Sequence, residues 1–205
     1  MKHLLITGAS TGIGYATAKA FLQKGYHVYG SIRKQEDADR LQAELGDNFS
    51  PLLFDVTDNA AIAAAAAQVE AEIGKTGLCG LINNAGIATA GPLMLQPLDN
   101  LRLQFEVNVI GLMAVTQAFL PLLGAQANPG FPPGRILMIS SISGKVSMPF
   151  LGAYVGSKHA LEGMTGSLRR ELLGYGIDVI SIGPGAIKTP IWDKSATRDL
   201  DQYEN

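Results

Sequence analysis

The sequence predicts an α/β fold in which one doubly wound parallel sheet lies between two layers of helices, a three-layer α/β/α arrangement in a single domain. Short apolar runs alternate with longer helical patterns along the 205 residues. The apolar runs are nearly continuous, as is typical of parallel strands buried on both faces. No internal repeat or linker interrupts the alternation, and the length suffices for one domain with a substantial core.

The predicted elements follow in order from the N-terminus. Strands are expected at 1–6, 27–32, 52–54, 78–82, 135–139 and 177–182, and helices at 15–24, 36–45, 59–73, 101–123 and 153–173. Either Asp58 or Asn59 is the expected N-terminal cap of the helix at 59–73. Pro121 interrupts the helix at 101–123, and the proline and glycine residues of 124–134 predict a loop.

A glycine-rich turn joins the first strand to the first helix, with Gly8, Gly12 and Gly14 directly after the apolar run. In such a strand–turn–helix unit, the first glycine permits the tight turn and the second lets the backbone approach a pyrophosphate. The third lets the helix pack closely on the strand. The helix N-terminus offers free N–H groups to phosphates. The turn therefore favours a Rossmann-type dinucleotide site.

Polar residues and glycines also follow several other predicted strands. They are Asp55, Asn83, Ser141 and the pair Pro184-Gly185. Because ligands of open parallel sheets bind beyond the carboxyl ends of the strands, we expect these residues to share one edge with the glycine-rich turn. The sequence thus predicts a binding site at this edge.

Tyr154 and Lys158 form a pair suited to proton transfer. Because they are four residues apart on a predicted helix, they lie on one face. A free phenol titrates near pH ~10, and a nearby ammonium group lowers that pKa by favouring the phenolate. Tyr154 is therefore a candidate general acid/base for a carbonyl and alcohol pair, and Ser141 lies thirteen positions before it.

Composition and charge argue against several other classes of protein. A net charge of −2 offers no broad basic surface to nucleic acid or to an anionic membrane. The single Cys79 excludes an internal disulfide and a cysteine metal cluster, and His3, His27 and His159 are scattered, so no metal site is expected.

Without a signal peptide or an apolar run of membrane-spanning length, a cytoplasmic protein is expected. The charged fraction of 17% is below the roughly 25% of average domains, which suggests surface buried in an oligomer.

Together and in this order, the motifs resemble the short-chain dehydrogenase/reductase family over nearly the whole chain. The matching segments are Thr7 to Gly14, Asn83-Asn84-Ala85-Gly86, Asn108, Ser141, Tyr154, Lys158, Pro184-Gly185 and Thr189-Pro190. The stretch 141–173 looks most like the hydroxysteroid and retinol dehydrogenase branch. The resemblance implies an oxidoreductase that transfers a hydride between nicotinamide and a small-molecule carbonyl or alcohol.

The resemblance implies a role for each matching residue. Tyr154 would exchange the proton of the substrate oxygen, Lys158 would lower the pKa of Tyr154 and hold the nicotinamide ribose, and Ser141 would orient the substrate oxygen. Asn108 would support a water-mediated proton relay through Lys158. Asp55 would contact the adenine, with a helix cap as the alternative. The implied cofactor-binding residues are Gly8, Ser10, Thr11, Gly12, Ile13, Gly14, Arg33, Asp55, Val56, Asn83, Ala85, Gly86, Tyr154, Lys158, Pro184, Gly185, Ile187 and Thr189.

The end of the second predicted strand bears on the choice of cofactor. NAD-binding relatives place an acidic residue there to hold both ribose hydroxyls, but this sequence has Ile32, Arg33 and Lys34. Ile32 cannot accept those hydrogen bonds, whereas Arg33 can form a charge-assisted fork with a 2′-phosphate. NADP(H) is therefore expected in preference to NAD(H). The alternative is that Arg33 and Lys34 are solvated charges at the start of a helix.

Apolar residues near the predicted site suggest an apolar substrate. Those that could line a pocket over the nicotinamide are Val146, Met148, Phe150, Leu151, Ile187, Ile191 and Trp192. A bulky ketone or secondary alcohol, of steroid or retinoid type, fits the branch that the sequence resembles. The alternative is that several of these side chains belong to the core.

The C-terminal end departs from the family pattern. Members usually continue through a mobile substrate lid and a final strand, but the polar stretch 195–205 has no core pattern. We expect that the 205 residues lack, or do not show, the lid and last strand; the alternative is a naturally short member. The resemblance also implies a homodimer or homotetramer assembled through the helices at 101–123 and 153–173.

Two other functions stay open. A catalytically silent nucleotide-sensing or scaffold protein could share the fold, and a sugar-nucleotide epimerase or dehydratase could use the same tyrosine and lysine. The complete set of Asn108, Ser141, Tyr154 and Lys158 disfavours the first. The glycine spacing and the Asn-Asn-Ala-Gly motif disfavour the second.

Overall fold

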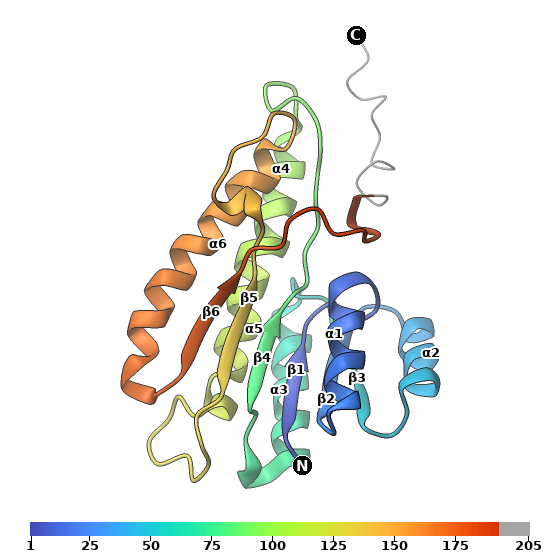
Figure 1. Cartoon of the computed structure of the whole chain (residues 1–205), viewed down its shortest axis with the longest axis vertical. Coiled ribbons are helices and arrows are strands. Elements are labelled where there is room, and N and C mark those ends of the chain that lie inside the picture. The colour runs from blue at the N-terminus through green and yellow to red at the C-terminus, as the bar shows by residue number, and fades with distance from the viewer. Residues whose placement is uncertain (193–205) are drawn as a thin grey trace.

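The computed structural model describes residues 1–192, and six parallel strands form its sheet. The strands are β1 (His3–Ile6), β2 (His27–Ile32), β3 (Phe49–Leu53), β4 (Gly80–Asn83), β5 (Arg135–Ile139) and β6 (Asp178–Ile182). Their order across the sheet is β3-β2-β1-β4-β5-β6 (Figure 1), with Leu5 of β1 in register with Tyr29 of β2 and Leu81 of β4. The strand order reverses between β1 and β4, which confirms the predicted doubly wound sheet.

Helices connect consecutive strands. They are α1 (Gly12–Gln23), α2 (Gln35–Leu45), α3 (Asn59–Ile73), α4 (Leu98–Phe105), α5 (Leu112–Phe119) and α6 (Gly152–Glu171), with shorter helical segments η1 (Gly74–Thr76), η2 (Glu106–Gly111), η3 (Pro121–Leu123), η4 (Ile142–Gly144) and η5 (Leu172–Tyr175). Asp58 caps α3, because its carboxylate accepts a hydrogen bond of 3.0 Å from the N–H of Ala61. Within residues 1–192, no helix is both long enough and apolar enough to cross a membrane.

Two apolar clusters lie on opposite faces of the sheet and produce the three layers. On one face α3, α5 and α6 contribute the fully buried Val69, Phe119 and Leu161. On the other face α1 and α2 contribute the buried Ala18 and Leu41 (Figure 1). Packed helices therefore hold β1, β4 and β5 from both faces of the sheet. The site at the carboxyl ends of these strands rests on this core.

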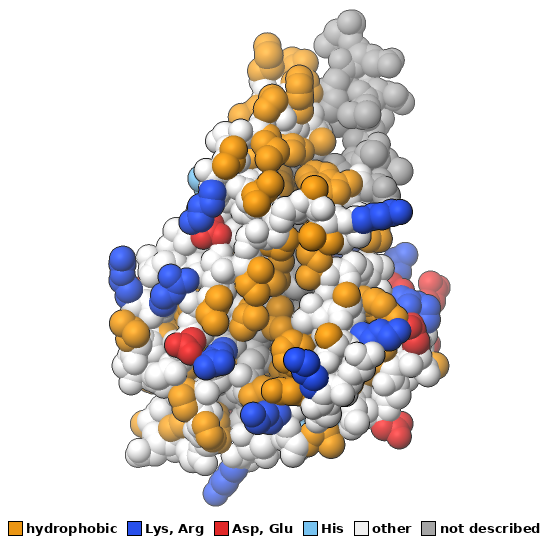
Figure 2. Space-filling model, in the orientation of Figure 1, with side chains coloured by type: hydrophobic (Ala, Val, Ile, Leu, Met, Phe, Trp, Pro, Cys, Tyr) orange, Lys and Arg blue, Asp and Glu red, His pale blue; other side chains and the backbone are white. Residues whose placement is uncertain are grey.

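The face beneath α1 and α2 is only partly covered. Val179 of β6 belongs to the cluster on the opposite face, so the alternating Ile180 and Ile182 point toward the α1 side. Each of these two isoleucines is 40% exposed. Figure 2 shows a band of apolar side chains along this face. Among the described residues, β6 pairs with β5 alone and forms an edge of the sheet.

Several predicted boundaries differ from the structure. The strand expected at 52–54 begins at Phe49, because β3 is an edge strand that tolerates Pro51. The helix expected at 101–123 begins at Leu98 and is divided by η2, a π-helical segment. Gly111 ends this segment where a Cβ would lie 2.6 Å from the carbonyl oxygen of Val56. The first helix begins at Gly12, and the strand expected at 78–82 spans Gly80–Asn83.

Candidate active site

The glycine-rich turn between β1 and α1 needs its three glycines. Gly8 and Gly12 have φ angles of +66° and +59°, in a region that disfavours residues with side chains. A Cβ at Gly14 would lie 2.3 Å from the Gly8 carbonyl oxygen. The Gly8 N–H donates to the Ser31 hydroxyl at 2.9 Å. Ser31 is absent from the sequence-based prediction, although a serine within an apolar strand is a visible signal.

Hydrogen bonds tie the end of β4 to the end of β1. The Thr7 hydroxyl accepts from the N–H groups of Asn84 and Ala85, both at 2.9 Å. The Asn84 amide donates to the carbonyl oxygens of Thr7 and Gly8 at 2.9 and 3.1 Å. Asn84 therefore holds the glycine-rich turn in place.

Asn83 does not face the cofactor site, contrary to the prediction. Successive side chains of a strand point to opposite faces, and Asn83 is fully buried. Its amide donates to the Thr116 hydroxyl of α5 at 2.7 Å and to the Met138 sulfur of β5 at 3.3 Å. Asn83 thus braces the central strands β4 and β5 against α5.

Ser141, Tyr154 and Lys158 converge at the end of β5. Ser141 precedes η4, and its hydroxyl accepts from the Ser143 N–H at 3.1 Å. Tyr154 and Lys158 lie on α6 and are 6% and 4% exposed. The Lys158 ammonium donates to the Ile139 carbonyl oxygen at 2.8 Å, and its nitrogen lies 5.7 Å from the centre of the Tyr154 ring. The predicted catalytic serine, tyrosine and lysine therefore share one site.

Burial dominates the proton affinities of this pair. Burial raises the pKa of Tyr154, and the Ser141 hydroxyl opposes it only in part. Burial also lowers the pKa of Lys158 to about 8, against an opposing effect of Glu162. The net effect on the pKa of Tyr154 is an increase, because the cost of burying a phenolate prevails and the Lys158 ammonium bonds to the Ile139 carbonyl. That Lys158 lowers the pKa of Tyr154 stays a prediction. At neutral pH Tyr154 is protonated.

Asn108 lies in η2, fully buried and outside the lining of the pocket described below. Its side-chain oxygen accepts from the Ile87 N–H at 2.9 Å, and its amide donates to the Ile87 carbonyl at 3.0 Å and to the Ser157 hydroxyl at 3.1 Å. Ser157 donates in turn to the Tyr154 carbonyl at 2.7 Å. Asn108 therefore connects the loop after β4 to the catalytic helix. Ile87 and Ser157 are contacts that the sequence analysis misses.

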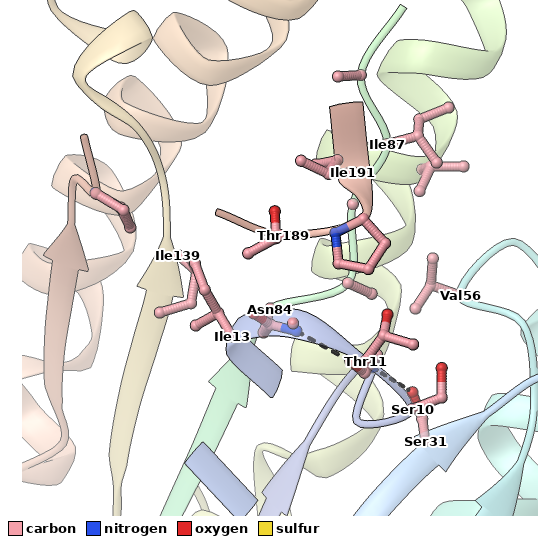
Figure 3. Close-up of a pocket in the computed structure, with 18 of the residues that line it drawn as sticks. Ser10, Thr11, Ile13, Ser31, Val56, Asn84, Ile87, Ile139, Thr189 and Ile191 are labelled. Atoms are coloured by element: carbon pink, nitrogen blue, oxygen red, sulfur yellow. Dashed lines mark hydrogen bonds between the residues drawn. The ribbon is translucent and has the colours of Figure 1, made fainter. Parts of the chain in front are cut away.

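A pocket of about 410 Å³ runs along this edge of the sheet (Figure 3). Every predicted catalytic or cofactor residue lines it except Gly14, Asn83 and Asn108. Lining residues absent from the prediction include Ser31, Asp37, Asn84, Ile87 and Ser140. Thr189 lies over the glycine-rich turn, since a Cβ at Gly12 would be 3.3 Å from the Thr189 Cβ.

The end of the pocket near β2 is charged. Arg33 Nη1 lies 3.6 Å from Asp55 Oδ2, and the two side chains are 66% and 37% exposed. Because so exposed an ion pair contributes little free energy, the guanidinium can turn to another anion. Asp55 also accepts from the N–H and hydroxyl of Thr57 at 3.0 and 2.8 Å. It is not the cap of α3, which is Asp58.

The opposite end of the pocket is apolar. Ile187, Ile191 and Trp192 line it, and the Trp192 ring lies edge-on to Tyr154 with centres 5.7 Å apart. Val146, Met148, Phe150 and Leu151 do not line it, contrary to the hypothesis. These four residues precede α6, in a segment whose Phe150 carbonyl accepts from the Gly91 N–H at 2.8 Å.

A glycine-rich turn at a helix N-terminus shares one pocket with a serine, a tyrosine and a lysine, at the point where the strand order reverses. This combination defines an oxidoreductase that uses a nicotinamide dinucleotide. Comparison with known proteins agrees, because the family model described as short chain dehydrogenase matches residues 2–199. The chain belongs to the short-chain dehydrogenase family and is an NAD(P)-dependent oxidoreductase.

Individual relatives agree with this assignment. The chain is 44% identical over 195 residues to the NADPH-dependent 3-dehydrocapnine reductase of Ornithobacterium rhinotracheale, covering 95% of this chain and 69% of that protein. It is 35% identical over 217 residues to retinol dehydrogenase 16 of Homo sapiens, covering 98% and 66%. The closed form of serine dehydrogenase complexed with NADP+ superposes with a TM-score of 0.88 at 29% identity, covering 99% and 82%. The chain spans 58% to 69% of the length of its curated relatives.

Proposed function

We propose that this protein uses NADPH to reduce a carbonyl group on an apolar small molecule. The observation that carries the proposal is the shared pocket, which places Ser141, Tyr154 and Lys158 beside the glycine-rich turn. Tyr154, protonated because its pKa is raised, donates the proton to the substrate oxygen. Ser141 holds that oxygen, and Lys158 binds the nicotinamide ribose.

The residues present fit a dinucleotide. Gly8 and Gly12 leave the turn free of side chains where the pyrophosphate would approach, and the N-terminus of α1 offers unpaired N–H groups. Bound nicotinamide supplies the hydride. Asp55 and Val56 line the same pocket and would flank the adenine.

A preference for NADP(H) rests on the charged end of the pocket. Arg33 and Lys34 line this end, and Ile32 offers no acceptor for ribose hydroxyls. The acidic Asp37, which also lines it, is neutralised by Arg40 at 3.0 Å. The names of two relatives support the same preference, since one reductase is NADPH-dependent and the serine dehydrogenase is complexed with NADP+.

An apolar ketone, of steroid or retinoid type, is the substrate class that we propose. Ile187, Ile191 and Trp192 provide an apolar wall beside Tyr154. The likeness to retinol dehydrogenase 16 supports a retinoid, and the likeness to 3-dehydrocapnine reductase supports the direction of reduction.

A panel of carbonyl compounds tests the proposed function. NADPH consumption would be followed with steroid ketones, retinal and small polar ketones at equal concentration. We expect the apolar ketones to give the higher kcat/KM. Turnover of the small polar ketones alone would overturn the substrate class, and turnover of none would remove support for the reductase.

We also propose a homodimer or homotetramer that uses the helices around η2 and α6. Leu103, Phe105 and Ile110 are 40%, 36% and 52% exposed on the segment α4–η2. Exposed apolar residues on a helical face are a common feature of subunit interfaces. Light scattering of the purified protein tests this proposal, and a monomer at micromolar concentration would contradict it.

A further inference from the structure

Glu162 lies on α6 one turn after Lys158 and connects the segments that carry the site. Its carboxylate accepts a hydrogen bond from the Ser181 hydroxyl of β6. It also pairs at 3.0 Å with the ammonium of Lys145, the residue directly after η4. The Glu162 side chain is 14% exposed, whereas that of Lys145 is 71% exposed. A mostly buried carboxylate thus joins α6, β6 and the turn at η4.

The turn that begins at Ser141 packs directly against Glu162. A Cβ at Gly144 would lie 2.8 Å from the Ser140 hydroxyl and 3.0 Å from Cγ of Glu162, so no side chain fits between the turn and α6. The start of the turn is also fixed to β6, because the Ser140 N–H donates to the Ile182 carbonyl at 2.7 Å. Displacement of Glu162 would therefore loosen the segment that holds Ser141.

Glu162 also counteracts the burial of Lys158. Burial lowers the pKa of Lys158, and within residues 1–192 Glu162 is the one charged group that raises it. Burial raises the pKa of the Glu162 carboxyl, but the Ser181 hydroxyl and Lys145 help to outweigh this effect and hold the pKa below its ordinary value. Glu162 is therefore ionised at neutral pH. The other titratable group beside Lys158 is Tyr154, which is neutral there.

We propose that Glu162 is a positioning residue for the reduction site, because its carboxylate holds the Ser141 turn against α6 one helical turn after the buried Lys158. Glu162 does not line the main pocket, so it acts through these neighbours and not by contact with substrate. The inference rests on the proposed function, in which the charged Lys158 holds the nicotinamide ribose.

The pH dependence of NADPH binding tests this proposal in the full chain. Fluorescence titrations between about pH 6 and 10 should show weaker binding as Lys158 loses its proton, with a midpoint near its pKa of about 8. In Glu162→Gln the midpoint should fall by about one pH unit, because a nearby negative charge is lost. Near pH ~6, the NADPH affinities of the wild type and Glu162→Gln should differ by less than about threefold, since Lys158 is protonated in both proteins.

Glu171→Gln provides the matched control, since it makes the same substitution at the exposed last residue of α6 and should leave the midpoint unchanged. An unchanged midpoint in folded Glu162→Gln would overturn the proposal. Absence of NADPH binding by the wild type at every pH would overturn the proposed function instead.

A second variant covers the case in which the Glu162→Gln protein does not fold properly. Lys145→Gln removes an exposed positive charge that partly neutralises Glu162. Glu162 then acts more strongly on Lys158, and the midpoint should rise by a few tenths of a pH unit. A midpoint that stays in place or falls would contradict the proposal.

Discussion

The Lys158 ammonium donates a hydrogen bond of 2.8 Å to the carbonyl oxygen of Ile139, the last residue of β5. The bond fixes the lysine between α6 and the edge of the sheet. One neutral acceptor does not replace the water that a buried ammonium loses, so the position costs folding free energy. We therefore expect Lys158 to serve the reaction at the expense of stability.

Replacement of Lys158 by Met should stabilise the fold and abolish turnover. The folded pKa of about 8 lies below the unfolded value of 10.5, so the unfolded chain binds more protons between these pH values. The stability of the wild type should consequently rise across this window, and the advantage of Lys158→Met, about 3 kcal/mol below pH ~8, should shrink. Urea unfolding of both proteins at several pH values measures this difference in unfolding free energy. A variant less stable than the wild type at pH 7 would contradict the burial cost.

Tyr154→Phe should remove turnover and retain cofactor binding. Loss of a positioned general acid reduces kcat by about 10²–10⁴-fold, whereas NADPH affinity should change by less than about threefold. Steady-state kinetics and a fluorescence titration on the same preparation separate the two effects. Full activity of the variant would show that another group donates the proton.

Gly14→Ala should destabilise the protein and weaken NADPH binding. The added Cβ would lie 2.3 Å from the Gly8 carbonyl oxygen, and such overpacking typically costs about 1–3 kcal/mol. Gly163→Ala on α6 is the matched control, because a Cβ there meets nothing within 4 Å. That change should stabilise the helix by about 0.5–1 kcal/mol. Thermal unfolding measures the change in stability of each variant relative to the wild type. Equal changes in the two variants would contradict the steric clash at Gly14.

Arg33→Ala should reduce the preference for NADPH over NADH by about tenfold or more, because the variant loses a charge-assisted contact with the 2′-phosphate. Affinity for NADH should change little. Arg102→Ala, which removes an arginine paired with Asp99 on α4, should leave the preference unchanged. If both variants behave alike, Arg33 is only a solvated charge.

The sheet and most of the site could be predicted from sequence because strand runs, glycines and the Tyr154–Lys158 spacing are local patterns. Their convergence follows from the rule that parallel strands end at one edge. Ser31 and Asn84 are harder to assign, since each acts on the glycine-rich turn from a segment distant in sequence. Their roles depend on register, which the sequence alone does not specify.

The pKa of Tyr154 and the apolar wall show where sequence reasoning is insufficient. A charge four residues away suggests a lowered pKa, but burial reverses the sign. Phe150 lies only four positions before the tyrosine, yet its backbone bonds to Gly91 and it does not line the pocket. Both outcomes depend on packing against residues far apart in the chain.

A fluorescence titration of the purified 205-residue chain with NADPH and, separately, with NADH tests the central claim most directly. We expect saturable binding of both cofactors, with a dissociation constant for NADPH at least about tenfold lower, because a charge-assisted contact holds its 2′-phosphate. Tighter binding of NADH would contradict the role of Arg33. Binding of neither would contradict the cofactor site itself.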